Sequence, residues 1–147
     1  MDFVNCYVDS KRADAYATLE FANTYYLAYR DLSAILAEHV TGKWALDFGC
    51  GTGRSTRFLR NLGFNVIGVD VSENMVRIAR ATDSSGDYRL VPDDNFDEID
   101  LGTFDFVFSA FTFDNIPGPM KQRIFRDHRN LLAPNGTIVN LVSSPEI

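Results

Sequence analysis

Short apolar runs alternate with stretches of helical periodicity along most of this sequence. Five runs have the length and apolar interior of buried strands: residues 44–48, 65–69, 88–91, 104–109 and 137–142. Between them, the spacing of apolar positions predicts helices over residues 54–62, 72–81 and 120–132, with a Pro134–Gly136 turn before the last strand. Alternating strands and helices imply a parallel sheet covered on both faces. The predicted fold class is therefore α/β, with a doubly wound, mostly parallel, Rossmann-like sheet.

The N-terminal third of the chain has a different pattern. From Ala13 to Val40, apolar residues recur at helical spacing, which predicts one or two helices ending near Thr41 and Gly42. No repeat, low-complexity tract or linker separates these helices from the strands. We therefore predict one domain, made of an N-terminal helical segment over residues 1–43 and an α/β core over residues 44–147.

Composition narrows the partners and the compartment. The net charge is −6 and no cluster of Lys and Arg provides a footprint for a polyanion, so no nucleic-acid partner is expected. No apolar run approaches the roughly 20 residues that span a bilayer, so no membrane partner is expected either. Cys6 and Cys50 are isolated, and the first residues lack the features of a signal peptide. These observations predict a cytoplasmic protein.

Candidate binding residues gather after the first predicted strand. They are Asp47, Gly49, Cys50, Gly51 and Gly53. Glycine allows positive φ angles and a close approach of a ligand to the backbone, and the start of the next helix offers unpaired N–H groups. The dinucleotide fingerprint G-x-G-x-x-G would need glycine at position 54, where Arg54 stands. A dehydrogenase is therefore the weaker interpretation of this loop, and a purely structural turn is another.

Asp70 ends the second predicted strand and follows Gly53 at a spacing that suits a nucleotide site. A carboxylate there can accept hydrogen bonds from both hydroxyls of a ribose. Its structural alternative is an acidic residue that favours the start of the next helix, for which Ser72 is a candidate N-cap.

Four segments carry motifs in a regular order: Asp47–Gly53, Gly68–Met75, Phe104–Ser109 and Leu131–Gly136. Together they resemble the motifs of class I S-adenosylmethionine (SAM) dependent methyltransferases. The resemblance implies that the chain binds SAM, transfers its methyl group to a small-molecule acceptor and leaves S-adenosylhomocysteine. It covers most of the chain from Trp44 onward.

The resemblance also implies roles for individual residues. The loop from Gly49 to Gly53 would pack against the methionyl and ribose parts of SAM, with Asp47 near the methionyl amino group and Asp70 on the ribose. Met75 or Val71 would contact the adenine face. An acidic residue after the third strand commonly meets the adenine amino group in this family, and the candidates here are Asp93 and Asp94, of which Asp94 fits slightly better.

Further candidates follow the fourth strand and lie near the N-terminus. By the resemblance, Ser109 and Ala110 border the methionyl moiety and Phe111 covers it, while Asp114 and Asn115 face the substrate. The alternative for these two polar residues is an ordinary loop and helix cap. The N-terminal segment would act as a lid, with Tyr16 reaching the carboxylate of SAM.

Other reactive residue types have structural interpretations. His39 and His128 have no Cys or carboxylate at ligand spacing, so we expect no metal site and predict that both lie on the surface or at helix ends. Cys50 is expected to pack rather than to act as a nucleophile. The sequence does not reveal a general base, and no catalytic residue is assigned.

The end of the sequence departs from the family. Class I methyltransferases usually add a last helix and an antiparallel strand pair after the fifth strand, whereas this sequence ends directly after it, at Ile147. The fifth strand is then expected to be an exposed apolar edge, which invites pairing with another chain. Two functions follow: the N-terminal fragment of a small-molecule methyltransferase, or a SAM-binding module that needs a partner chain or a homo-oligomer to complete its sheet.

Overall fold

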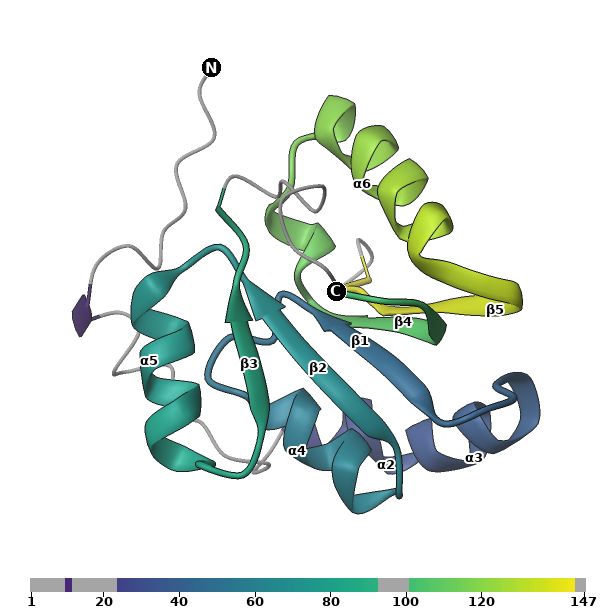
Figure 1. Ribbon diagram of the computed structural model, residues 1–147, viewed down its shortest axis with the longest axis horizontal. Coiled ribbons are helices and arrows are strands. Elements are labelled where there is room, and N and C mark those ends of the chain that lie inside the picture. The colour runs from purple at the N-terminus through teal and green to yellow at the C-terminus, as the bar shows by residue number, and fades with distance from the viewer. Residues whose placement is uncertain (1–9, 12–23, 93–100, 145–147) are drawn as a thin grey trace.

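A computed structural model describes residues 10–11, 24–92 and 101–144 of the chain, and its centre is one parallel sheet (Figure 1). The sheet order is β3-β2-β1-β4-β5, and every pairing between neighbours is parallel. The strands are β1 Trp44–Phe48, β2 Asn65–Asp70, β3 Asp87–Leu90, β4 Phe104–Ala110 and β5 Leu132–Leu141. This topology confirms the predicted doubly wound α/β fold.

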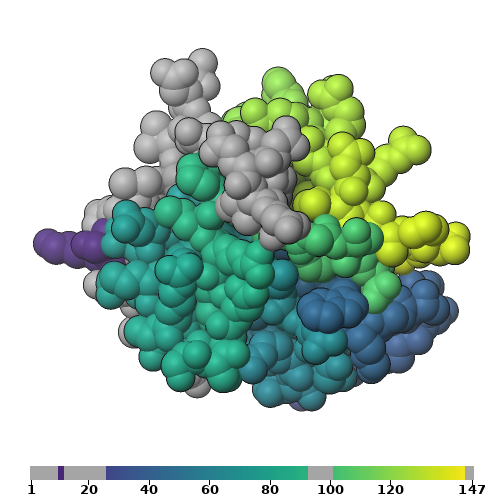
Figure 2. Space-filling view, in the orientation of Figure 1, coloured from purple at the N-terminus to yellow at the C-terminus, as the bar shows by residue number. Residues whose placement is uncertain are grey.

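Helices cover both faces of the sheet. They are α2 Thr24–Arg30, α3 Leu32–His39, α4 Arg54–Asn61, α5 Glu73–Thr82 and α6 Gly118–Leu131, with a short 3₁₀ helix, η4, over Phe113–Asn115. In Figure 1, α2, α3 and α4 lie on one side of the sheet and α6 on the other. Figure 2 shows α5 with β3 (teal) and α6 with β5 (green to yellow) on different sides of the visible face. Within the described ranges, no helix combines the length and apolar character needed to cross a membrane.

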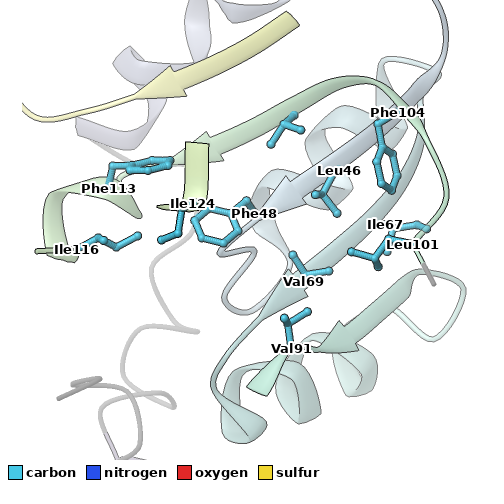
Figure 3. Close-up of a cluster of buried hydrophobic side chains, with 11 residues drawn as sticks. Leu46, Phe48, Ile67, Val69, Val91, Leu101, Phe104, Phe113, Ile116 and Ile124 are labelled. Carbon is cyan, nitrogen blue, oxygen red and sulfur yellow. The ribbon is translucent and has the colours of Figure 1, made fainter. Parts of the chain in front are cut away.

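The core under α6 is built from strand residues that face this side of the sheet (Figure 3). Successive side chains of a strand point to opposite faces, so every second residue of β1 and β2 contributes, whereas the two members from β4 are three positions apart. Phe113, Ile116 and Ile124 gather beside Phe48 at one end of the cluster. The other members are Leu46, Ile67, Val69, Val91, Leu101, Phe104 and Val107.

The opposite face packs against the N-terminal helices and α4. Tyr29, Leu32 and Leu36 of α2 and α3 are buried against the strand residues of this face, together with Leu59 of α4. The intervening strand residues are Ala45, Val66, Phe106 and Phe108. The predicted N-terminal helices are thus confirmed over the described part and belong to the same hydrophobic core as the sheet.

Strand β5 begins earlier than the sequence predicted. Leu132 already pairs with Phe104, and the register shifts before Thr137 pairs with Phe106. The predicted turn falls inside this irregular section, where Asn135 has a φ of 67°. β5 pairs with β4 and is the edge of the described sheet, as the sequence predicted.

His128 lies in the last turn of α6, as predicted, but it is not at the surface. Its side chain is fully buried (0% exposed), because it lies one helical turn after Ile124 on the face of α6 that meets the sheet. The ring packs edge-on against Phe48, with 4.6 Å between ring centroids. Burial lowers the pKa of His128 to about 4, so the imidazole is neutral at physiological pH. His39, in contrast, is exposed in the last turn of α3, as predicted.

Candidate functional site

The carboxyl ends of β2, β1 and β4 meet where the strand order reverses, since the chain leaves β1 toward β2 and later returns to β4 on the other side. Open α/β sheets bind ligands at this position. The loop after β1 contains three glycines with positive φ: Gly49 at 70°, Gly51 at 54° and Gly53 at 84°. Gly53 is also the N-cap of α4, so the helix starts directly from this strained turn.

Asp70 fastens the glycine loop to the end of β2. One carboxylate oxygen, Oδ2, accepts a hydrogen bond from the Gly51 backbone N–H at 2.8 Å, and Oδ1 accepts one from the Ser72 N–H at 2.8 Å. Burial raises the pKa of Asp70, and the backbone donors oppose that rise. The Val71 N–H is a further backbone donor to this carboxylate, so about one of its roughly four lone-pair sites remains for another donor.

Asp47 lies under the loop on the α4 face of β1 and is 0% exposed. Its Oδ2 accepts hydrogen bonds from the hydroxyls of Ser55 and Thr56, both at 2.6 Å. Its Oδ1 is buried and has no hydrogen-bond partner in the described structure. Burial raises the pKa of Asp47 to about 6, and the negative charge of Asp70 adds to this effect. A buried carboxylate with one unpaired oxygen is rare without a functional reason.

The glycines of the loop leave no room for side chains. A Cβ at Gly49 would lie 2.3 Å from the Thr112 hydroxyl, and one at Gly53 would lie 2.7 Å from the Tyr88 ring and hydroxyl. Thr112 Oγ1 also donates to the Phe48 carbonyl oxygen at 3.2 Å, which links the segment after β4 to the loop after β1. These contacts hold the loop from both sides.

The start of α5 follows Asp70. Ser72 is the N-cap, as predicted, and its hydroxyl oxygen accepts a hydrogen bond from the Met75 N–H at 3.4 Å. Met75 is buried (2% exposed), whereas Val71 is half-buried. The structure therefore brings both adenine candidates next to Asp70, with Val71 the more accessible of the two.

The end of β4 places the next predicted residues. The Ser109 hydroxyl donates to Asn140 Oδ1 of β5 at 2.7 Å, and Ser109 is fully buried. Ala110 and Phe111 are half-buried. Phe111 has a φ of 60° and its backbone N–H donates to the Leu141 carbonyl oxygen at 2.8 Å. The Ser109 side chain is thus committed to the pairing of the two strands.

The predicted substrate residues lie in η4 and are exposed. Asp114 accepts hydrogen bonds from the Ser143 hydroxyl at 2.7 Å and from the Ser143 backbone N–H at 3.1 Å. Asn115 Nδ2 donates to the Phe111 carbonyl oxygen at 3.4 Å. In this structure Asp114 ties the segment after β4 to the segment after β5.

A family model described as a methyltransferase domain matches residues 45–136, which is more than half of the chain. The chain belongs to the methyltransferase domain family. Its parallel sheet and motif order are those of the class I, SAM-dependent architecture, so the predicted family is confirmed.

Similar proteins are considerably longer than the part of their sequences that matches this chain. The ubiquinone biosynthesis O-methyltransferase of Thiobacillus denitrificans is 33% identical over 101 residues, which cover 66% of this chain and 42% of that protein. The CcbJ methyltransferase of Streptomyces caelestis has a similar structure, with a TM-score of 0.69, 28% identity, and 86% of this chain and 54% of that chain covered. A SAM-dependent methyltransferase of Clostridium acetobutylicum shares the fold, with a TM-score of 0.72, 24% identity, and 95% and 58% covered. The chain thus spans about two fifths of the length of the Thiobacillus relative.

Sequence reasoning missed several residues that shape the methyltransferase site. Ser55 and Thr56 in the first turn of α4 bind Asp47, and Tyr88 and Thr112 pack under the loop. Hydroxyl residues two and three positions after Gly53 were a usable signal, because the first turn of a helix that follows this loop faces the end of β1. Tyr88 and Thr112 are distant in sequence and carried no signal. The predicted residues Tyr16, Asp93 and Asp94 lie outside the described ranges.

The other end of the methyltransferase sheet carries a different polar group. A depression of about 570 Å³ lies where α4 ends and β2 begins, with these lining residues: Arg57, Arg60, Asn61, Gly63, Phe64, Asn65, Asp83 and Ser85. Asp83 accepts hydrogen bonds from Arg60, from the Ser85 hydroxyl and from the Tyr88 hydroxyl.

Cys50 is buried in the glycine loop, and burial raises the pKa of its thiol, as expected of a packing residue. Across the described residues, no group of three His, Cys, Asp or Glu could hold a metal ion.

Proposed function

We propose that this chain binds SAM at the carboxyl ends of β1, β2 and β4 and forms the cofactor-binding part of a small-molecule methyltransferase. The observation that carries the proposal is the hydrogen bond from the Gly51 N–H to Asp70 Oδ2. It holds a glycine loop, whose backbone a ligand can approach closely, against a carboxylate that keeps a lone pair for a ribose hydroxyl.

The described residues suit the parts of SAM in order. Asp70 receives the ribose, and Val71 or Met75 contacts the adenine. The loop from Gly49 to Gly53 lies along the ribose and methionyl parts, because its glycines bring the backbone close. Asp47 attracts the methionyl ammonium group, which suits a buried carboxylate oxygen that has no donor. Ala110 and Phe111 border the methionyl moiety, with Ser109 holding β4 to β5 beneath them.

The remaining assignments rest on the family resemblance. Asp93 or Asp94 meets the adenine amino group, and Tyr16, from the segment before α2, reaches the SAM carboxylate. Because α2 and α3 pack in the core, the lid is limited to that preceding segment. Two exposed residues of η4, Asp114 and Asn115, border the acceptor. We also assign the protein to the cytoplasm, where the free thiol of Cys50 would persist.

The chemistry requires little of the protein beyond positioning. Bound SAM supplies an electrophilic methyl group on a sulfonium. The chain orients the cofactor through Asp70 and the glycine loop, and this positioning is its main contribution to the transfer. His128 is neutral and buried between α6 and the sheet. It therefore packs in the core and does not take a proton from the acceptor. An acceptor with a low pKa needs no base from the protein.

A hydroxyl group on a small molecule is the proposed acceptor. The name of the Thiobacillus relative specifies an O-methyltransferase. The chain carries a net charge of −6 and no basic cluster, which suits a small substrate better than a nucleic acid.

Calorimetric titration with S-adenosylhomocysteine, the product form of the cofactor, tests the cofactor site. We expect wild type to bind with a micromolar Kd, and Asp70→Asn to weaken binding by about 30-fold or more because hydrogen bonds to the ribose and to the loop weaken. Asp87→Asn is the matched control, since Asp87 is an exposed carboxylate that pairs with Arg89 at 2.7 Å, away from the site. The control should bind as wild type does.

Two outcomes would overturn the proposal. A folded wild-type chain that does not bind S-adenosylhomocysteine would remove the cofactor site. Binding of NADH in competition with S-adenosylhomocysteine would revive the dehydrogenase interpretation, which the arginine at position 54 disfavours.

The edge of the sheet favours a second candidate, a SAM-binding module that works as a dimer. β5 pairs with β4 and carries half-buried apolar residues, Ile138, Val139 and Leu141, at the edge of the described sheet. Pairing of two such edges would complete the sheet. Sedimentation velocity at several concentrations tests this: a dimer lost in Val139→Lys supports it, and a monomer that binds S-adenosylhomocysteine contradicts it.

A further inference from the structure

The carboxylate of Asp47 is held asymmetrically. Both hydroxyl donors, Ser55 Oγ and Thr56 Oγ1, bind the same oxygen, Oδ2, at 2.6 Å. The second oxygen, Oδ1, is buried and accepts no hydrogen bond from any residue that the structure describes. Two donors on one oxygen fix the rotation of the carboxylate, so the orientation of Oδ1 is set by the first turn of α4.

Three separate elements build this arrangement. Asp47 lies on β1, the two hydroxyls lie on α4, and Gly68 of β2 pairs with Asp47 in the parallel register. A Cβ at Gly68 would lie 2.7 Å from Thr56 Oγ1 and 3.1 Å from Cys50 Sγ. The absence of a side chain at position 68 therefore makes the space in which the Thr56 hydroxyl reaches Asp47.

An unpaired carboxylate oxygen in this place destabilises the empty protein. Burial opposes its charge, and the charge of Asp70 on the neighbouring strand opposes it further. Among the described residues, only the two neutral hydroxyls stabilise the charge of this carboxylate. A positively charged donor, rather than another neutral one, would balance the site, either directly or through one buried water.

We propose that Ser55 and Thr56 are positioning residues that hold Asp47 so that Oδ1 is presented to the α-ammonium group of the cofactor. This inference rests on the proposed binding of SAM and assigns the recognition of one part of it. The two hydroxyls do not contact the cofactor; they act through Asp47. They should therefore matter for ligands that carry the amino acid part of SAM and not for ligands that lack it.

Two related ligands separate this role from a structural one. S-adenosylhomocysteine carries the ammonium group, whereas 5′-methylthioadenosine has the same adenosine and sulfur but no amino acid part. We expect Ser55→Ala/Thr56→Val to weaken binding of S-adenosylhomocysteine by about 10- to 100-fold, the effect of losing a well-oriented charge-assisted hydrogen bond. Binding of 5′-methylthioadenosine should stay within about twofold of wild type.

Conservative and remote variants complete the design. Thr56→Ser keeps the hydroxyl and should restore most of the affinity lost in Thr56→Val. Thr82→Val removes an exposed threonine at the end of α5 and should change neither ligand. If the double variant does not fold, Thr56→Val and Thr56→Ser alone carry the test, measured with both ligands by calorimetry.

The outcomes distinguish this inference from the proposed function. Equal losses for both ligands, or no loss for either, would overturn the positioning role while leaving the cofactor site in place. A folded wild-type chain that binds neither ligand would overturn the cofactor site itself and the inference with it.

Discussion

Asp47 and Asp83 are two carboxylates that accept hydrogen bonds from hydroxyl groups, but they are held in opposite ways. Asp83 accepts hydrogen bonds from the side chains of Arg60, Ser85 and Tyr88. Although burial alone would raise its pKa, these donors lower it to about 2. Asp47 accepts two hydroxyl donors on one oxygen and, among the described residues, none on the other, and burial raises its pKa to about 6.

The difference separates a carboxylate that stabilises the fold from one that, under the proposed function, receives its charged partner from the cofactor. The donors around Asp83 join the end of α4 to β3, so its charge strengthens the structure. The surroundings of Asp47 leave its charge partly unbalanced in the empty protein. Residues in binding sites often lower stability in this way, because their partners arrive with the ligand.

The largest effect should come from Asp47→Asn. We expect the Kd for S-adenosylhomocysteine to rise by about 100-fold, because a neutral amide cannot balance an ammonium group. Isothermal titration calorimetry measures this, with Asp87→Asn, a change of the exposed carboxylate paired with Arg89, as the control that should bind within about twofold of wild type. A similar loss of affinity in both variants would show that the effect is not specific to Asp47.

Asp47→Asn should weaken cofactor binding but increase the stability of the protein without cofactor. At pH 7.5, Asp47→Asn should raise the free energy of unfolding by about 2–3 kcal/mol, since the pKa of Asp47 lies at about 6 rather than the ordinary 3.8. Below pH 3.8 the carboxyl is protonated in both the folded and unfolded states, so the advantage of the variant should disappear. Between pH 3.8 and about 6 it should grow as the pH rises. Urea denaturation at several pH values measures it, and an advantage independent of pH would argue against an ionised, unbalanced Asp47.

Asp83→Asn should instead destabilise the fold, by about 1–2 kcal/mol at pH 7.5, because charge-assisted hydrogen bonds become neutral ones. The stabilising contribution of Asp83 is present above pH 3.8 and is lost as the pH falls through about 2. Urea denaturation of the two proteins at pH 7.5 measures the difference. An unchanged or increased stability would show that the group around Asp83 is not a structural anchor.

The smallest effect is expected for Asp114→Ala. Asp114 lies at the carboxyl end of the sheet, like Asp47, but it is exposed and bonded to Ser143. We expect a loss of at most about 1 kcal/mol in stability, typical of exposed hydrogen bonds, and an unchanged affinity for S-adenosylhomocysteine. Thermal unfolding and calorimetry check both, and a loss of cofactor affinity would move Asp114 into the cofactor site.

Much of the fold was predictable from the sequence because its periodicity is strong. The strand Trp44–Phe48 was predicted at its observed bounds, and the glycine loop and Asp70 were correctly placed at the ends of two strands. The start of β5 was not predictable, because Leu132 joins the sheet through its pairing with Phe104, a contact distant in sequence. The helix-end position of His128 was predictable, but its burial was not, because a polar residue at a helix end usually stays exposed.

The candidate site was predictable only in part. Motif residues such as Asp47 and Gly51 follow from spacing along the chain. Ser55 and Thr56 donate to the same oxygen of Asp47, and Gly68 leaves the space for that contact because it has no side chain. The fold brings these positions together from three elements. Spacing alone does not reveal such a convergence.

Hydrogen–deuterium exchange of the wild-type chain with and without saturating S-adenosylhomocysteine tests the proposed cofactor site most directly, because it compares the two ends of α4 in one experiment. We expect slower exchange over residues 47–56 and 68–75, around Asp47 and Asp70, and unchanged exchange over residues 59–65, where α4 ends and β2 begins. Protection confined to residues 59–65, or no protection at the glycine loop, would contradict the proposed site.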